Sequence, residues 1–229
     1  MNKVFAFIFA RGGSKGLPRK NVLPIGGLPL ISHSIQLAKE HDAVEKVFVS
    51  TDCDEISQIA QDAGANIIKR PDELATDNAA EWLAWKHAIN EVIQSGDSFN
   101  TFLSLPPTAP LRNIIDIDNC ICALKPNIDA VITMTKSQRN PWFNMVSQSS
   151  EGHVYLINGD EGINRRQDAP QCFDMTTVAY AAKVEFVLSA NKIWEGKVAG
   201  VEIPVERALD IDTLLDFKIA RFLMENYDS

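Results

Sequence analysis

Short apolar runs alternate along the chain with segments in which apolar residues recur at helical spacing. Several of these runs are almost continuously apolar, which is typical of strands covered on both faces. The runs that we expect to form strands span residues 4–10, 46–50, 101–105, 130–135, 177–183 and 198–203. The sheet that they build is therefore predicted to lie between layers of helices.

The segments between the strands carry apolar residues on one helical face. The four groups are Ile56, Ile59, Ala60 and Ala63; Trp82, Trp85, Ile89 and Val92; Ile114, Ile117, Ile121 and Leu124; and Leu215, Ile219, Phe222 and Leu223. Strands that alternate with helices favour right-handed crossovers and parallel pairing. We expect an α/β fold with a Rossmann-like, mainly parallel sheet and helices on both faces.

This alternation breaks between residues 136 and 170. The segment is polar and rich in turn-forming residues, with one short strand signal at 153–157. We interpret it as a small β-rich excursion from the sheet, which can serve as a lid or a dimerisation arm. The chain is predicted to be one domain, 1–229, with this excursion at about 136–170.

Charge is distributed unevenly. The formal net charge is −8, yet six Lys or Arg residues and no acid precede Glu40. An acidic body argues against a broad nucleic-acid surface, whereas a small cationic segment suits a compact anion. No apolar run is long enough to span a membrane, and the four cysteines lack metal-ligand spacing. We therefore expect no nucleic-acid or membrane partner, and a cytoplasmic protein with reduced thiols.

The cationic segment is the stretch FARGGSKGLPRKN, residues 9–21, directly after the first apolar run. Its glycines let backbone N–H groups approach a ligand, and its four Lys and Arg side chains supply charged donors. Together they predict a cradle for phosphate groups. The spacing matches neither a Walker loop nor the G-x-G-x-x-G pattern of dinucleotide sites. The alternative is a tight strand-to-helix turn with a solvated basic rim.

Three carboxylates late in the chain, Asp210, Asp212 and Asp216, are candidates for metal binding. In extended backbone the side chains of residues i and i+2 point the same way, so Asp210 and Asp212 can face one ion. Asp212 can equally be the N-cap of a helix beginning at Thr213, and Asp216 fits the first turn of that helix. Opposite a polyphosphate the metal hypothesis is the stronger one, because Mg²⁺ (or Mn²⁺) is held by one or two carboxylates together with phosphate oxygens.

Residues 10–21 resemble the opening motif of the acylneuraminate cytidylyltransferase family, the CMP-sialic acid synthetases, which reads close to A-R-x-G-S-K-G-[LI]-P-x-K-N. The matching residues are Ala10, Arg11, Gly13, Ser14, Lys15, Gly16, Leu17, Pro18, Lys20 and Asn21. Further family motifs follow in order: VSTDCDEI at 49–56, RPDELATD at 70–77, PPTAPLR at 106–112, NPWFNM at 140–145, RRQDAP at 165–170 and DIDTLLDF at 210–217. The likeness covers nearly the whole chain.

The resemblance implies a fold of the nucleotide-diphospho-sugar transferase type. It also implies a reaction in which the anomeric hydroxyl of a nine-carbon 2-keto sugar acid attacks the α-phosphate of CTP and pyrophosphate leaves. The implied CTP-binding residues are Ala10, Arg11, Gly12, Gly13, Ser14, Lys20, Asn21, Arg70 and Asp77. The implied metal ligands are Asp210 and Asp212, and the implied catalytic residues are Arg11, Lys20, Asp210 and Asp212. Candidates on the side of the acid are Arg166, Gln167, Phe173 and Tyr180. The resemblance further implies that the excursion is a dimerisation arm and that the protein is a homodimer.

Two sites depart from the family pattern. Pro106 stands where relatives carry a glutamine, and Thr176 and Thr177 stand where they carry Asn-Gly. Both sites fall in the expected acid pocket, while the phosphate loop and the aspartate pair are intact. We therefore predict a CTP enzyme for a nonulosonic acid that need not be N-acetylneuraminate, such as a legionaminic-type or deaminated acid. The alternatives are a nucleotidyltransferase for a Kdo-like acid and a catalytically silent CTP-binding protein.

Overall fold

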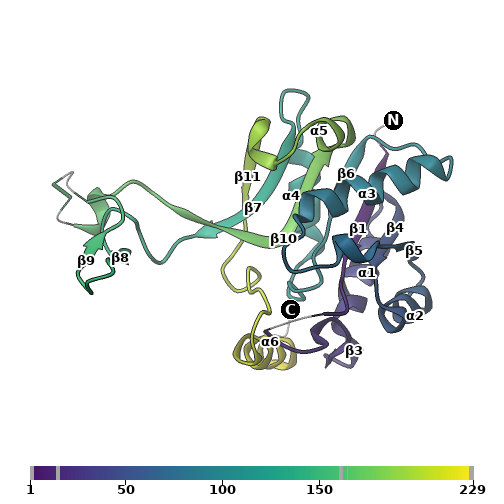
Figure 1. The fold of residues 1–229 in the computed structure, drawn as a ribbon, viewed down its shortest axis with the longest axis horizontal. Helices are drawn as coiled ribbons and strands as arrows, with labels where there is room; N and C mark the ends of the chain where they lie inside the picture. Colours follow the sequence, from purple (N-terminus) through teal and green to yellow (C-terminus); the bar gives the residue numbers. More distant parts are fainter. Residues whose placement is uncertain (1–2, 14–15, 160–161, 164, 227–229) are drawn as a thin grey trace.

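A seven-stranded sheet forms the centre of the computed structural model, which describes residues 3–13, 16–159, 162–163 and 165–226 (Figure 1). The strand order is β11-β7-β10-β6-β1-β4-β5. The strands are β1 (Val4–Phe9), β4 (Val44–Thr51), β5 (Asn66–Lys69), β6 (Thr101–Ser104), β7 (Ala130–Lys136), β10 (Phe173–Lys183) and β11 (Val198–Glu202). Only β10 among the described strands of this sheet runs antiparallel to its neighbours, β6 and β7. The prediction of an α/β fold with a mainly parallel sheet is confirmed.

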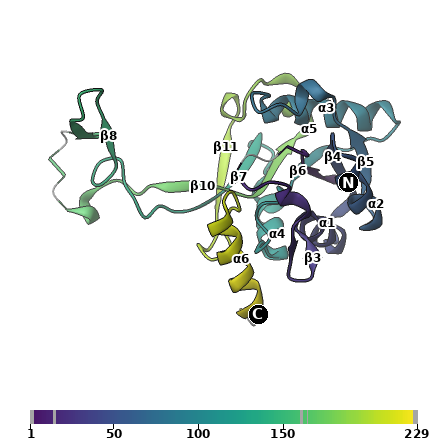
Figure 2. The same cartoon turned by 60° about the horizontal axis from the view of Figure 1, so that its bottom comes forward.

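Helices cover both faces of the sheet (Figures 1 and 2). They are α1 (Leu30–Glu40), α2 (Asp54–Asp62), α3 (Glu81–Gln94), α4 (Ile114–Ala123), α5 (Val184–Ser189) and α6 (Leu214–Asn226), with 3-10 helices η1 (Lys20–Val22), η2 (Asp72–Leu74), η3 (Arg166–Asp168) and η4 (Ile193–Glu195). Successive residues of β1 point to opposite faces. Ala6 and Ile8 therefore pack in the core with α1, α2 and α4, whereas Phe5 and Phe7 pack in the core with α3 and α5. Both faces of this strand are apolar, which explains its continuous apolar run.

The helical face predicted for the last helix is wrong. Leu215, Ile219 and Phe222 are exposed on α6, whereas Phe217 and Ala220 are buried. The buried pair packs in a small cluster with Leu17, Ile25, Leu30 and Ile211. Because apolar residues occur on both sides of α6, periodicity alone does not identify its inner face. The faces predicted for α2 and α3 do lie in the two cores.

Some elements of the structure are not predicted from the sequence pattern. These are β5, α1 and the two-residue strands β2 (Pro24–Ile25) and β3 (Leu28–Pro29), which pair with each other. Each is too short or too mixed in polarity for its periodicity to stand out. Among the described residues, no helix has both the length and the apolar character required to cross a membrane.

Between β7 and β10 the chain leaves the sheet and extends away from it as an arm (Figures 1 and 2). The arm carries β8 (Val146–Gln148) and β9 (Val154–Leu156), which pair in antiparallel fashion. β9 lies within the strand predicted at 153–157, and β8 is not predicted. The side chains of Val146, Val154 and Tyr155 are exposed, and a two-stranded pair is only marginally stable by itself in water. The division into one domain with a dimerisation excursion stays a prediction.

Candidate active site

Three loops meet at the carboxyl ends of β1 and β6 and enclose a cavity of ≈ 520 Å³. The loops are the segment after β1, residues 106–108 after β6, and residues 210–213 before α6. The cavity is lined by Phe9, Arg11, Gly16, Lys20, Asn21, Glu81, Pro106, Pro107, Thr108, Thr177, Tyr180, Asp210, Asp212 and Thr213. Ligands of open α/β sheets bind in this kind of crevice, beyond the carboxyl ends of the strands.

The cavity has two parts, which we name by their residues. The loop end is lined by Arg11, Gly16, Lys20 and Asp212, and the proline end by Pro106, Pro107, Thr177 and Tyr180. The loop end therefore contains part of the predicted phosphate cradle, and the proline end contains Pro106 and Thr177, two of the three positions at which the sequence departs from the family pattern.

The phosphate loop, residues 10–21, is tied to β4 and the turn after it. The Ala10 N–H donates to the Ser50 carbonyl (3.1 Å), and the Gly12 N–H donates to Asp52 Oδ1 (2.9 Å). A side chain at Gly13 would stand in open space, so a ligand can approach the backbone there. These contacts hold the loop across the end of the sheet.

Asn21 stabilises the same loop from its far side. Its amide donates to the Arg11 carbonyl (3.2 Å), while its Oδ1 is buried and has no hydrogen-bond partner among the described residues. Buried polar atoms normally have a partner, so this oxygen is available to a ligand donor. Ser14, which the family resemblance assigns to CTP, lies outside the described residues.

The two loop cations that line the cavity are held by carboxylates. Arg11 Nη1 lies 2.6 Å from Asp77 Oδ1. The ammonium of Lys20 donates to Asp212 Oδ1 and to the Ile211 carbonyl, both at 2.8 Å. Lys20 is only 16% exposed, so its charge is fixed in direction rather than free to swing. It joins the first loop of the sheet to the segment that precedes the last helix.

Gly16 permits this junction. A Cβ atom at position 16 would lie 2.3 Å from the Asp212 carbonyl oxygen, closer than two such atoms can approach. Glycine is therefore required by space at this position, independently of any ligand.

The two predicted metal ligands line the same cavity but differ in their partners. Asp212 is paired with Lys20, whereas Asp210 Oδ1 is buried and has no hydrogen-bond partner among the described residues. A buried carboxylate oxygen without a donor is costly unless a cation or a ligand donor meets it. The donor chemistry therefore fits a divalent cation that also binds phosphate oxygens.

The alternative role of Asp212 as a helix cap is wrong. Helix α6 begins at Leu214, and the residue before it, Thr213, forms the cap. The Thr213 N–H donates to Asp216 Oδ2 (2.7 Å), and the Asp216 N–H donates to Thr213 Oγ1 (3.3 Å), which is a reciprocal capping box. Asp216 thus serves the first helical turn, as predicted, and the Asp212 carboxylate is free of this duty.

Arg70 contributes to the framework rather than to the cavity lining. Its guanidinium donates to Ser50 Oγ (3.1 Å) and the Ser50 carbonyl (2.7 Å), and it lies over the Phe9 ring at 5.5 Å. Burial lowers the pKa of this guanidinium. The side chain therefore fixes the end of β5 against β4, next to a ring that does line the cavity.

Of the four residues predicted on the acid side, only Tyr180 lines the cavity. Burial, and then the nearby carboxylates of Glu81 and Asp210, raise the pKa of its hydroxyl. Arg166 and Gln167 lie in η3 on the arm, where Arg166 Nη2 donates to the Gln138 carbonyl (3.1 Å). Phe173 opens β10 at its arm end, opposite Lys136, whereas Tyr180 lies opposite Ile132, about 13 Å further along the sheet. The single chain does not bring these three residues to its own cavity.

Glu81 is the cavity residue that sequence reasoning misses most clearly. It is the first residue of α3, and its Oε1 accepts a hydrogen bond from Trp85 Nε1 (3.3 Å). Solvent reaches this side chain from the cleft, yet the protein atoms around it raise the pKa of its carboxyl by desolvation. The sequence signal in this region is the apolar Trp82/Trp85 face of α3. That signal predicts the helix but not the direction of the Glu81 side chain at its start.

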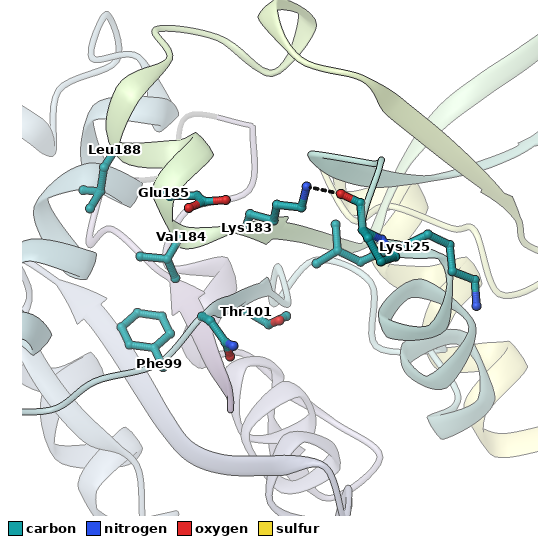
Figure 3. Close-up of a pocket in the computed structure, with 10 residues that line it drawn as sticks. Phe99, Thr101, Lys125, Lys183, Val184, Glu185 and Leu188 are labelled. Atoms are coloured by element: carbon teal, nitrogen blue, oxygen red, sulfur yellow. Dashed lines mark hydrogen bonds between the residues drawn. The ribbon is translucent and has the colours of Figure 1, made fainter. Parts of the chain in front are cut away.

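A second cavity, of ≈ 620 Å³, lies at the other end of β6 and β10 (Figure 3). Its lining includes Phe99, Thr101, Lys125, Val184 and Leu188 and none of the predicted site residues. Lys183 is already engaged there, since its ammonium donates to the Pro126 carbonyl (2.8 Å). The chemistry-bearing residues gather in the smaller cavity, which is our candidate active site.

Comparisons with known proteins identify the family of the chain. A family model described as cytidylyltransferase matches residues 5–139. The chain is 34% identical to the post-translational flagellin modification protein B of Campylobacter coli, over 98% of this chain and 96% of the relative. It is 35% identical to the CMP-N,N'-diacetyllegionaminic acid synthase of Campylobacter jejuni, over the same shares of the two chains.

The solved structures that resemble this chain share its fold at low sequence identity. A CMP:2-keto-3-deoxy-manno-octonic acid synthetase complexed with CTP superposes with a TM-score of 0.72 at 16% identity, covering 98% of this chain and 99% of that one. A 4-diphosphocytidyl-2C-methyl-D-erythritol synthase gives a TM-score of 0.70 at 10% identity, covering 98% and 100%. The family model matches more than half of the chain, and both relatives match it over almost their whole length. The chain therefore belongs to the cytidylyltransferase family and is a nucleotidyltransferase.

Proposed function

We propose that this protein activates a nonulosonic acid by cytidylyl transfer: CTP and the acid give the CMP-sugar and pyrophosphate. The observation that carries the proposal is the meeting of the phosphate loop with Asp210 and Asp212 in one cavity. The anomeric hydroxyl of the acid attacks the α-phosphate in line, pyrophosphate leaves, and the hydroxyl proton passes to the aspartate pair. In such transfers the protein mainly positions groups and stabilises charge.

The chain's own residues have separable tasks in this scheme. Arg11 and Lys20 bind the phosphates, and Lys20 is held in place by the Ile211 carbonyl. Backbone N–H groups around Gly13 approach the triphosphate where no side chain intervenes. Asp210 and Asp212 would hold Mg²⁺ or Mn²⁺. When bound, that ion would neutralise charge on the phosphate oxygens.

We take an N-acyl acid of the legionaminic type as the first substrate to test. The support is the 35% identity to a relative whose name specifies N,N'-diacetyllegionaminic acid. The likeness to the CMP:2-keto-3-deoxy-manno-octonic acid synthetase, at 16% identity, concerns the fold alone. The Kdo-like acid therefore remains the second candidate.

The arm supports a further part of the proposal, a homodimer in which each arm reaches the partner's cleft. Val146, Val154 and Tyr155 leave apolar surface exposed on a strand pair that needs a packing partner. Arg166, on the same arm, is then delivered to the second copy, where its guanidinium can bind the sugar carboxylate.

The four free cysteines fit a reducing cytoplasm, where we place the protein.

Complementation tests the exchange of arms. Asp210→Asn inactivates the cleft and Arg166→Ala inactivates the arm, so each variant alone should be nearly inactive. If the arms act in trans, an equal mixture that has exchanged subunits regains about a quarter of the wild-type activity, because half of the dimers are mixed and each holds one intact site. No recovery in a mixture that light scattering shows to be dimeric would contradict arm exchange.

The reaction itself is tested by pyrophosphate release from CTP and Mg²⁺ with a panel of acids: N,N'-diacetyllegionaminic, N-acetylneuraminic, deaminoneuraminic and Kdo. We expect turnover with a nine-carbon acid, and its loss on adding EDTA. Turnover with Kdo alone would favour the second candidate. Binding of CTP without turnover on any acid would favour a silent CTP-binding protein.

A further inference from the structure

Strand β10, which contributes Thr177 and Tyr180 to the proline end, is irregular between Thr176 and Tyr180. β10 pairs with β7 as Thr176 opposite Thr133, and the pairing resumes as Tyr180 opposite Ile132. Three residues on β10 therefore intervene where the partner strand has none. Such bulges re-aim side chains and often lie beside active sites. The direction of Thr176 and Thr177 cannot be obtained from simple strand alternation.

The hydroxyl of Thr176 is directed into the sheet. It donates to Thr133 Oγ1 (2.8 Å), and Thr133 Oγ1 in turn accepts from the Ala179 N–H (3.1 Å) and lies 3.0 Å from the Ala179 carbonyl oxygen. Thr176 is 6% exposed and does not line the cavity. Its hydroxyl therefore holds the bulge together and is not available to a ligand.

Thr177 has the opposite environment. It lines the cavity, and its Oγ1 is buried without a hydrogen-bond partner among the described residues. Thr177 lines this end of the cavity together with Pro106 and Pro107. Proline has no N–H to offer. Neither of these prolines can therefore donate a backbone hydrogen bond to the Thr177 hydroxyl.

A buried arginine fixes both walls of the proline end. Arg112 donates from Nε to the Val178 carbonyl, from Nη1 to Ser34 Oγ (2.9 Å) and from Nη2 to the Pro106 carbonyl (2.6 Å). Val178 follows Thr177, so the same guanidinium anchors the strand that carries Thr177 and the loop that faces it. The distance between the Thr177 hydroxyl and the proline wall is therefore set by the framework.

We propose that Thr177 is the residue that selects the acid, and that it selects acids with an N-acyl group. Its hydroxyl donates to the acyl carbonyl, and the acyl methyl packs on Pro106 and Pro107. An N-acyl group offers this combination of one acceptor and one apolar end, whereas a hydroxyl in its place offers no apolar end. The inference rests on the proposed reaction, because it concerns the second substrate of that same cleft.

Two matched substitutions and one conservative control test this role of Thr177. Thr177→Val and Thr176→Val remove the same hydroxyl from adjacent residues at almost constant volume, and Thr177→Ser keeps the hydroxyl at position 177. Each variant is assayed with two acids that differ only in acetamido against hydroxyl, N-acetylneuraminic and deaminoneuraminic acid, and with the N,N'-diacetyl acid. The KM for CTP is measured in parallel.

In the wild-type protein we expect kcat/KM to favour the acetamido acid over its hydroxyl analogue. Thr177→Val should lower kcat/KM for the N-acyl acids by about 10-fold, with little change for the hydroxyl analogue and in the KM for CTP. Thr177→Ser should restore most of the preference. Thr176→Val should lower the melting temperature and leave the preference in place, because its hydroxyl only stabilises the bulge.

The outcomes separate this inference from the function on which it rests. If the wild-type protein converts these acids but Thr177→Val keeps the full preference for the acetamido acid, the inference is overturned and the reaction stands. The same holds if Thr176→Val alone erases the preference. If the wild-type protein converts none of the nine-carbon acids, the proposed reaction fails, and the role of Thr177 fails with it.

Discussion

At the loop end of the cleft Arg11 and Lys20 have carboxylate partners within the chain, whereas at the proline end the Thr177 hydroxyl has no partner among the described residues. The physical reason lies in the cost of an isolated charge. A partly buried cation without a counter-ion is far more expensive than a single unpaired hydroxyl. The loop end is thus held in shape by the chain itself, and in our proposal the acid supplies the partner that the proline end lacks.

The largest effect is expected for Asp210→Asn. This change keeps the size of the side chain but removes the charge of the one buried carboxylate oxygen in the cleft that lacks a donor among the described residues. We expect kcat to fall by about 10²–10³-fold, the usual loss for a preorganised charge-stabilising group. Pyrophosphate release measures the loss. An unchanged melting temperature should accompany it, and wild-type activity would contradict the role of Asp210.

Arg112→Leu should destabilise the fold at the proline end of the cavity. It leaves the Val178 and Pro106 carbonyls without their shared donor, and burying unpaired carbonyls costs about 1–3 kcal/mol each. We expect a loss of about 2–4 kcal/mol in the free energy of unfolding, measured by urea denaturation.

The charge of Arg112 limits that loss at neutral pH. Burial lowers the pKa of its guanidinium to about 9, so below that pH the fold carries a buried charge that the unfolded chain solvates freely. For this group alone, stability rises as the pH passes from 9 towards the ordinary arginine value. The deficit of Arg112→Leu against wild type should therefore be smaller at pH 7 than at pH 10. A deficit that shrinks with rising pH would contradict this account.

Gly16→Ala should disturb the loop end while leaving the proline end intact. The new methyl would collide with the Asp212 carbonyl oxygen and push the phosphate loop away from residues 210–213. We expect the KM for CTP to rise by about 10-fold, with the preference among acids unchanged. Gly159→Ala is the matched control, since its methyl would meet only ordinary contacts at 3.6–3.8 Å.

The smallest effect is expected for Asp216→Asn. Hydrogen bonds from the Thr213 hydroxyl and from the Thr213 and Asp212 N–H groups lower the pKa of Asp216. A lowered carboxyl pKa contributes stability that is present above the unfolded value, near 4, and is lost as the pH falls through the folded value. The variant should cost about 0.5–1 kcal/mol at pH 7 and less near pH 2. Melting curves at both pH values measure this, and an equal deficit at both would contradict it.

The sequence predicts the sheet body well and the site unevenly. The core strands and the α3 face are predictable because both faces of β1 are apolar and Trp82, Trp85 and Ile89 share one helical side. The loop end is predictable for a related reason: glycines and cations adjacent in sequence stay adjacent in space. On α6, apolar residues lie on both sides, so the same reasoning selects the exposed face.

The proline end depends on features with no local signature. The β10 bulge is set by a side-chain contact between Thr176 and Thr133, 43 residues apart. Only that contact separates the roles of two adjacent threonines. Glu81 and the location of Arg166 are similar cases, because the direction of a helix's first residue and the destination of the arm are decided by tertiary structure. Local sequence pattern therefore predicts the phosphate loop more readily than the residues proposed to select the acid.

The bond from Lys20 to the Ile211 carbonyl spans 191 positions. On the ribosome, at roughly 5–20 residues per second, the phosphate loop emerges on the order of 10–40 s before the backbone that anchors its lysine. Until then the nascent chain has a cationic loop without its anchor, and it cannot hold nucleotide in the geometry of the finished cleft. The proposed nucleotide site is thus completed only late in translation, and a chain interrupted before residue 211 would lack it.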